Sequence, residues 1–130
     1  MVLVDTNVLL DVVTGDARWS DWSRSQLVHW LDTGPVVINA IIYGEIAFAC
    51  EHIESVDALL PAHLYDDRAI PREAAFLAAR AHAAYRERGG SRQMILPDFL
   101  IGAHALVESM ALLTVTGGSL ESNQSLLASV

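Results

Sequence analysis

Three acidic residues, Asp5, Glu45 and Asp98, lie in apolar runs of sequence where a globular domain rarely places a charge. None of them has a basic residue three or four positions away that could neutralise it on a helix. A carboxylate inside a core is costly unless it is paired or binds a metal. Oxygen ligands suit Mg²⁺ or Mn²⁺, which keep several waters and share their sites with substrate phosphate. The three acids therefore predict one shared cation.

Two of these acids also have a simpler interpretation at the start of a helix. Asp5 ends the apolar run Val2–Val4, so it is either an N-cap or a ligand at the carboxyl end of a strand. Asp98 follows Pro97, and an acid in the first helical turn complements the helix dipole. Its helical face carries the small residues Gly102, Ala105 and Ser109, which leave room for close approach by another element or for a cleft.

Glu45 has the strongest sequence signal of the three. Its helical neighbours, at three and four residues on either side, are all apolar: Ile41, Ile42, Phe48 and Ala49. We therefore expect Glu45 to project from a buried face. The alternative, in which Glu45 has a purely structural role, requires an arginine distant in sequence as its partner.

The composition predicts one globular domain over residues 1–130, because 52% of the residues are apolar and 18% are charged. The net charge of −8 argues against binding nucleic acid through a basic surface, although a metal can screen phosphate at the site itself. Cys50 is the single cysteine, so no internal disulfide forms. No apolar run reaches a membrane span and the N-terminus lacks a basic signal region, so a cytoplasmic protein is expected.

The predicted strands and helices alternate along the chain, which favours a parallel sheet covered by helices on both faces. Strands are expected at residues 2–4, 36–38 and 112–116, and helices at 7–13, 19–31, 40–51, 56–60, 71–88 and 97–110. The serine-rich tail, 117–130, is atypical and is expected to pack poorly.

Other polar and aromatic residues give weaker signals. The histidines are scattered without ligand spacing, so surface or core roles are favoured and zinc is not indicated: His29, His52, His63, His82 and His104. The tryptophans of the 19–31 helix indicate packing or an interaction groove. The arginines around Gly89 and Gly90 mark a solvated helix end or a phosphate contact: Arg86, Arg88 and Arg92.

Three parts of the sequence together resemble the PIN-domain family, and within it the VapC toxins of bacterial toxin–antitoxin pairs. They are the start Asp5-Thr6-Asn7-Val8-Leu9-Leu10-Asp11, the isolated Glu45, and the stretch from Arg88-Gly89-Gly90-Ser91 to Ile95-Leu96-Pro97-Asp98-Phe99-Leu100-Ile101-Gly102-Ala103-His104-Ala105. The first motif is weak alone, and the last, at this distance, is quite specific. The resemblance covers about Met1 to Thr114.

The resemblance implies a three-layer α/β/α domain with a central parallel sheet. It also implies a ribonuclease that depends on Mg²⁺ or Mn²⁺ and is held inactive by a VapB-type antitoxin. By position, Asp5 and Asp98 match the main metal ligands and Glu45 the third acid, and all three are the expected catalytic residues. Glu45 is the candidate that orients or deprotonates the attacking water. A homodimer is expected, with an antitoxin groove lined partly by the 40–51 helix and the Trp19–Leu31 helix.

The end of the chain departs from the family pattern. The family usually continues the last strand as L-L-T-R-D, whereas Leu112-Leu113-Thr114 is followed here by Val115-Thr116. Thr116 thus stands where a fourth acid is expected. Glu121 is the next acid along the chain, but it is too distant from that position to be assigned the same role.

Two rival functions follow from these observations. One is a PIN-domain protein that binds an antitoxin but has impaired catalysis, which the missing fourth acid motivates. The other is a phospho-accepting aspartate protein, such as a receiver domain or a haloacid-dehalogenase-type phosphatase. Those families use a lysine to bind the phosphoryl group, and all eight cationic residues here are arginine. P-loop chemistry is excluded because there is no G-K-[ST] motif.

Overall fold

The computed structural model describes residues 1–15, 20–90 and 94–115. Its centre is a four-stranded sheet in the order β3-β2-β1-β4, in which every pair is parallel. The strands are β1 (Val2–Val4), β2 (Val36–Ile38), β3 (Tyr65–Asp67) and β4 (Ala111–Leu113). The predicted tail, 117–130, and Thr116 lie outside the described residues.

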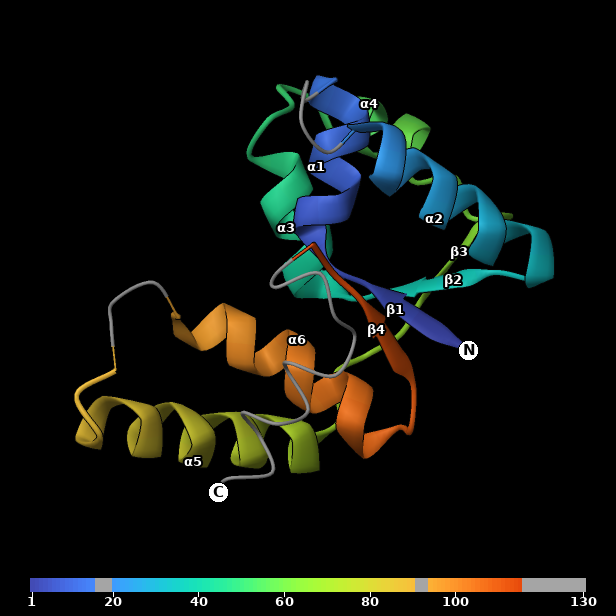
Figure 1. The fold of residues 1–130 in the computed structure, drawn as a ribbon. Helices are drawn as coiled ribbons and strands as arrows, with labels where there is room; N and C mark the ends of the chain where they lie inside the picture. Colours follow the sequence, from blue (N-terminus) through green and yellow to red (C-terminus); the bar gives the residue numbers. More distant parts are fainter. Residues whose placement is uncertain (16–19, 91–93, 116–130) are drawn as a thin grey trace.

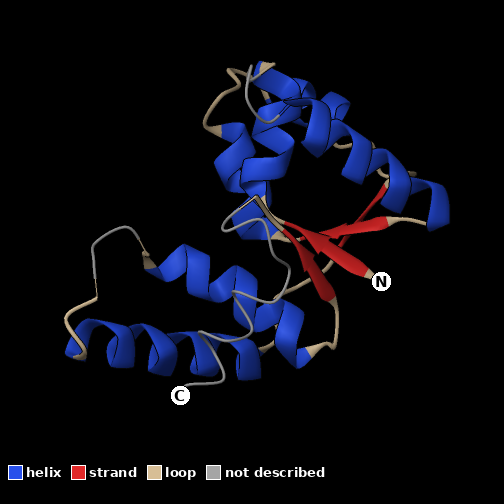
Figure 2. Cartoon of the chain, viewed as in Figure 1, coloured by secondary structure: helices blue, strands red, loops and turns tan. Residues whose placement is uncertain are grey.

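Helices cover both faces of this sheet, which confirms the predicted α/β/α class (Figures 1 and 2). One side carries α1 (Thr6–Thr14), α2 (Ser20–Thr33), α3 (Ala40–Ala47) and α4 (Ile53–Leu59). The other side carries α5 (Arg72–Glu87) and α6 (Leu96–Val107), which pack against each other along their length. Among the described helices, none is long and apolar enough to cross a membrane.

The two central strands form where the sequence predicts them, because their residues are β-branched or leucine and are buried on both faces. β4 ends at Leu113, earlier than the predicted 112–116. β3 was not predicted. It is a three-residue edge strand with two aspartates, so it lacks the apolar signal of a buried strand.

The helix around Glu45 is shorter than the predicted 40–51. The amides of Ala49 and Cys50 bond to carbonyls three residues back, which tightens the chain into a turn after Ala47. The long alanine-rich helix ends at Glu87, one residue before the predicted Arg88. Gly89 follows with φ of +73°, a conformation that glycine adopts without strain.

Two apolar clusters stabilise the fold. The main core lies around the sheet and consists mostly of valine, leucine and isoleucine from β1, β2, β4, α1 and α3, with Ile101 and Ala105 contributed by α6. The α5–α6 cluster is separate and is built from small residues around one ring: Ala74, Ala78, Ala81, Phe99 and Ala103.

Candidate active site

Asp5 lies at the carboxyl end of β1, directly before α1. Its backbone N–H donates to the Leu113 carbonyl at 2.8 Å, so the β1–β4 pairing extends to the acid itself. Asp5 occupies the N-cap position of α1, but its side chain makes no capping hydrogen bond. Asp5 is therefore the N-cap residue by position, as the simpler interpretation predicts, but its carboxylate does not cap α1 and lines the pocket instead.

Glu45 lies in α3, which begins at a well-defined cap. The Asn39 side chain accepts hydrogen bonds from the Ile41 and Ile42 amides, both at 3.1 Å. Glu45 is half-buried, beside the fully buried Ile42, so it lies at the margin of the core rather than inside it. Its Oε1 accepts a hydrogen bond from the Thr6 hydroxyl at 2.7 Å. In the described part of the chain no arginine pairs with Glu45, which excludes the structural alternative there.

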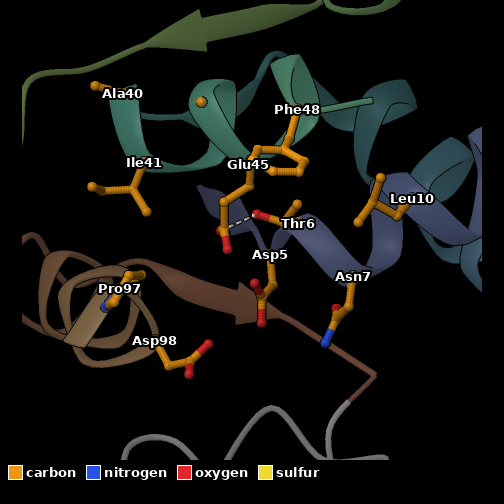
Figure 3. A pocket seen from close by; sticks show the side chains of 11 residues that line it. Asp5, Thr6, Asn7, Leu10, Ala40, Ile41, Glu45, Phe48, Pro97 and Asp98 are labelled. Carbon is orange, nitrogen blue, oxygen red and sulfur yellow. Dashed lines mark hydrogen bonds between the residues drawn. The ribbon is translucent and has the colours of Figure 1, made fainter. Parts of the chain in front are cut away.

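Asp98 is the third residue of α6, and its carboxylate has a structural contact as well. Its Oδ2 accepts a hydrogen bond from the Ile95 backbone N–H at 2.9 Å, in the manner of a capping box. The predicted role at the helix start is confirmed. Figure 3 shows the same carboxylate extending into the pocket toward Asp5.

One pocket, with a volume of about 610 Å³, brings the three acids together. Its polar side carries Asp5, Glu45 and Asp98, and its apolar side is formed mainly by Leu10 and α3 (Figure 3). Its lining residues are Asp5, Thr6, Asn7, Leu10, Ala40, Ile41, Gly44, Glu45, Phe48, Pro97 and Asp98. Phe48 is 96% exposed, so the apolar rim of the pocket faces solvent.

The electrostatics of the pocket are unfavourable for an ionised Asp5. The pKa of Asp5 is raised from 3.8 to about 6; burial is the largest cause of the rise, and the charges of Asp98 and Glu45 contribute to it. Hydrogen bonds from the Thr114 hydroxyl and the Thr6 backbone oppose this shift. The folded chain thus holds a carboxylate that is costly to ionise and that the described arginines do not neutralise.

Sequence reasoning missed three polar residues that arrange these acids. The Thr114 hydroxyl donates to Asp5 Oδ2 at 3.0 Å and accepts from Asn7 Nδ2 at 3.3 Å. Asn7 Oδ1 in turn accepts a hydrogen bond from the Val115 backbone N–H at 3.3 Å. The Thr6 hydroxyl donates to Glu45. Thr6 and Asn7 directly follow Asp5 in the sequence, which is a usable signal. Thr114 lies 109 residues from Asp5, and only the β1–β4 pairing reveals its role.

The donor set fits a hydrated divalent cation better than a closed metal cage. Within the described residues, no group of three or more histidine, cysteine, aspartate or glutamate side chains is arranged to hold a metal ion directly. Mg²⁺ does not need such a cage, because it usually keeps several waters and binds one or two carboxylates. Asp5 and Asp98 face one pocket with oxygen donors only, which matches that chemistry.

The remaining sequence candidates lie away from the pocket. Trp22 and Trp30 pack against the main core, and α2 contacts α1 rather than lining the pocket, so the predicted groove between α2 and α3 does not match this pocket. Trp19 and Arg92 lie outside the described residues. Arg86 and Arg88 are exposed and do not line the pocket. None of the five histidines lines it either, and His104 is a fully buried core residue.

Comparison with known proteins identifies the family. No curated protein matches the chain significantly. A solved structure, the crystal structure of VapBC2 from Rickettsia felis bound to a DNA fragment from their promoter, has the same fold, with a TM-score of 0.67 and 17% sequence identity. The match covers 88% of this chain and 87% of that one. The sequence profile of the PIN domain matches residues 2–116, nearly the whole chain before the tail. The chain therefore belongs to the PIN-domain family.

Proposed function

We propose that this protein is a ribonuclease that depends on Mg²⁺ or Mn²⁺ and acts as the VapC-type toxin of a toxin–antitoxin pair. The observation that carries the proposal is the half-buried Asp5, with a pKa of about 6, facing Glu45 and Asp98 across one pocket. PIN domains are generally nucleases, and the similar R. felis structure is a VapBC complex.

The charge of the site supports the need for a cation. Three carboxylates in one pocket would repel a phosphodiester, and the net charge of −8 adds to that repulsion. When bound, a divalent cation would lower the pKa of a water molecule and stabilise charge on the phosphate. Asp5 and Asp98 are the residues that would hold it, one from the end of β1 and the other from the start of α6.

Glu45 is suited to the proton transfer. Its Oε1 is occupied by the Thr6 hydroxyl, which fixes the direction of the carboxylate and leaves Oε2 for a water molecule in the pocket (Figure 3). In this proposal Glu45 orients the attacking water and accepts its proton. Thr114 and Asn7 keep Asp5 in place while charge changes beside it.

The test is RNA cleavage by the purified chain with Mn²⁺ or Mg²⁺, compared with Asp5→Asn and Asp98→Asn. Both variants should reduce cleavage to the level of buffer, as should removal of metal by a chelator. Asp32→Asn is the matched control, since it removes an exposed carboxylate on α2, a helix that does not line the pocket. Cleavage by Asp98→Asn at the rate of the unmodified protein would exclude the assignment.

A second candidate is a PIN domain with impaired catalysis that keeps antitoxin binding. The observation that favours it is Thr116, which occupies the position of the usual fourth acid and lies outside the described residues. The same assay separates the two functions. An impaired protein would bind Mn²⁺ in calorimetry and bind its antitoxin, yet leave RNA intact at every metal concentration.

The pocket rim suggests where an antitoxin segment would bind. Leu10, Ile41 and the exposed Phe48 give an apolar side, and the three acids give a negative floor that favours a basic side chain. Phe48→Ser should weaken binding of the antitoxin, and Phe76→Ser, an exposed phenylalanine on α5, is the control. We also propose a homodimer, which light scattering would exclude by showing a monomer at all concentrations.

A further inference from the structure

His104 is a fully buried histidine in α6, six residues after Asp98. Both of its ring nitrogens have partners. Nδ1 lies 2.9 Å from the Asn39 side-chain nitrogen, and Nε2 lies 2.8 Å from a carboxylate oxygen of Glu108. Asn39 is also fully buried and directly precedes α3, the helix that carries Glu45. A directional contact therefore joins the helix of one acid to the beginning of the helix of another.

The amide of Asn39 has only one favourable orientation. Its Oδ1 accepts the hydrogen bonds of the Ile41 and Ile42 amides that cap α3. Rotating the amide by half a turn would place its NH₂ group against those two N–H donors and remove the cap. The Asn39 nitrogen is therefore held toward His104, where it donates a hydrogen bond.

This orientation determines the tautomer of His104. Because Asn39 donates to Nδ1, that nitrogen must carry a lone pair, and the ring proton is on Nε2, from which it is donated to Glu108. The result is a chain of hydrogen bonds from Glu108 through His104 and Asn39 to the first turn of α3.

We propose that His104 and Asn39 form a positioning pair that sets the location of Asp98 relative to Glu45 and Asp5. This inference rests on the proposed nuclease function, because it assigns these two residues a role in arranging that site. Apolar contacts from Ile101 and Ala105 attach α6 to the main core, but such contacts have little directional preference. The His104–Asn39 hydrogen bond fixes the rotation and axial position of α6, and with them the place of Asp98 in the pocket.

The geometry is tested first without metal or substrate. Nitrogen NMR of the full chain should show His104 as the neutral tautomer with the proton on Nε2. Residual dipolar couplings of the amides in α3 and α6 then report the relative orientation of the two helices. Asn39→Ser keeps an N-cap for α3 but is too short to reach His104, and His104→Phe removes the acceptor. Both should reorient α6, while Glu108→Gln, which keeps an acceptor for Nε2–H, should not.

The functional consequence is measured on the same folded variants. Asn39→Ser and His104→Phe should weaken Mn²⁺ binding about tenfold and lower kcat for RNA cleavage about 10- to 100-fold. KM for RNA should change little, because neither residue reaches the pocket. Glu108→Gln should leave all three quantities unchanged.

The outcomes separate this inference from the nuclease assignment. An Nδ1–H tautomer, or an unchanged α6 orientation in both variants, overturns the positioning role whatever the protein's activity. A reoriented α6 with unaltered Mn²⁺ affinity and kcat overturns it as well. A reoriented α6 in a protein whose unmodified form neither binds Mn²⁺ nor cleaves RNA supports the positioning pair and excludes the nuclease.

Discussion

Asp5 and Asp98 face one pocket from two regions that are built differently. Asp5 follows β1, a strand of the main core, where the central strands of valine, leucine and isoleucine are buried on both faces. Asp98 belongs to the α5–α6 pair, where four alanines surround Phe99. Small side chains allow two helices to approach closely, but they bury little area each and contribute little energy. Phe99 is the large fully buried side chain of that cluster, and rings of His82 and Tyr85 pack against it.

The difference shows how rigidity is distributed around the site. The position of Asp5 follows from sheet pairing, in which many backbone hydrogen bonds act together. The α6 helix, which carries Asp98, packs on the main core through Ile101 and Ala105 and on α5 around Phe99. Its directional contacts are few: the capping contact with Ile95 and, in our proposal, the hydrogen bond between His104 and Asn39. We therefore expect the α6 side of the site to respond more strongly to single substitutions than the β1 side.

The largest effect is expected from cavities placed in each region. Phe99→Ala should lower the free energy of unfolding by about 3 to 5 kcal/mol, and Leu112→Ala in β4 by about 2 to 5 kcal/mol. Denaturant titration measures both. Although the losses of stability are similar, Phe99→Ala should also weaken Mn²⁺ binding by the molecules that remain folded, because it loosens the helix that carries Asp98. Leu112→Ala should weaken this binding less. Equal losses of metal affinity would remove the distinction between the regions.

The next prediction compares the two acids themselves. Asp5 binds a proton more tightly in the folded state, so the folded chain loses stability as the pH rises from about 4 to about 6. Asp5→Asn removes this loss. In metal-free buffer at pH 7.5, the free energy of unfolding of the Asp5→Asn variant should rise by up to about 3 kcal/mol, the upper limit set by the difference between the two pKa values.

The gain from Asp5→Asn should shrink toward zero below about pH 4, where the carboxyl is protonated in both states. Asp98→Asn should give no comparable gain, because its carboxylate also caps α6 through Ile95. Thermal unfolding from pH 3.5 to pH 8 checks both statements. A pH-independent gain, or a loss of stability in Asp5→Asn at pH 7.5, would contradict the electrostatic explanation.

A smaller effect is expected from the hydroxyl that holds Glu45. Thr6→Val keeps the shape of the side chain but removes its donor, so it should cost about 1 to 2 kcal/mol of stability and lower RNA cleavage. Thr6→Ser keeps the hydroxyl and is the control. If the valine and serine variants cleave RNA equally well, the Thr6 hydrogen bond does not position Glu45 for the reaction.

Much of the site was predictable from the sequence, because its signals are local. Asp5, Glu45 and Asp98 stand out as charges without neighbouring partners in apolar runs, and two of the strands follow from their β-branched residues. The parts that were missed depend on contacts between distant segments. Thr114 meets Asp5 only through β1–β4 pairing, and β3 forms as an edge strand beside β2.

The partners of His104 show the same limit. An isolated histidine in an apolar helix indicates a core residue, and it is one. Its contact with Asn39, 65 residues away, follows from the tertiary fold and has no signature in the local sequence.

The smallest effect is expected at Thr116, outside the described residues. Thr116→Asp restores the acid at the family position, so it should tighten Mg²⁺ binding by about 1 kcal/mol, the value for one partly solvated charge. It should also raise RNA cleavage. Calorimetry with Mn²⁺ on the two proteins checks this prediction, and equal affinities would show that three acids alone define the site.

The order of the strands has a consequence for protein synthesis. β1 emerges from the ribosome first, yet one of its two neighbours in the sheet is β4, more than a hundred residues later. Asp5 is thus anchored to Leu113 only when nearly the whole domain has been made. Long-range parallel pairing of this kind is slow to form. In the nascent chain, Asp98 can therefore join Asp5 and Glu45 only after α6 and β4 have been made, so the pocket is completed late in folding.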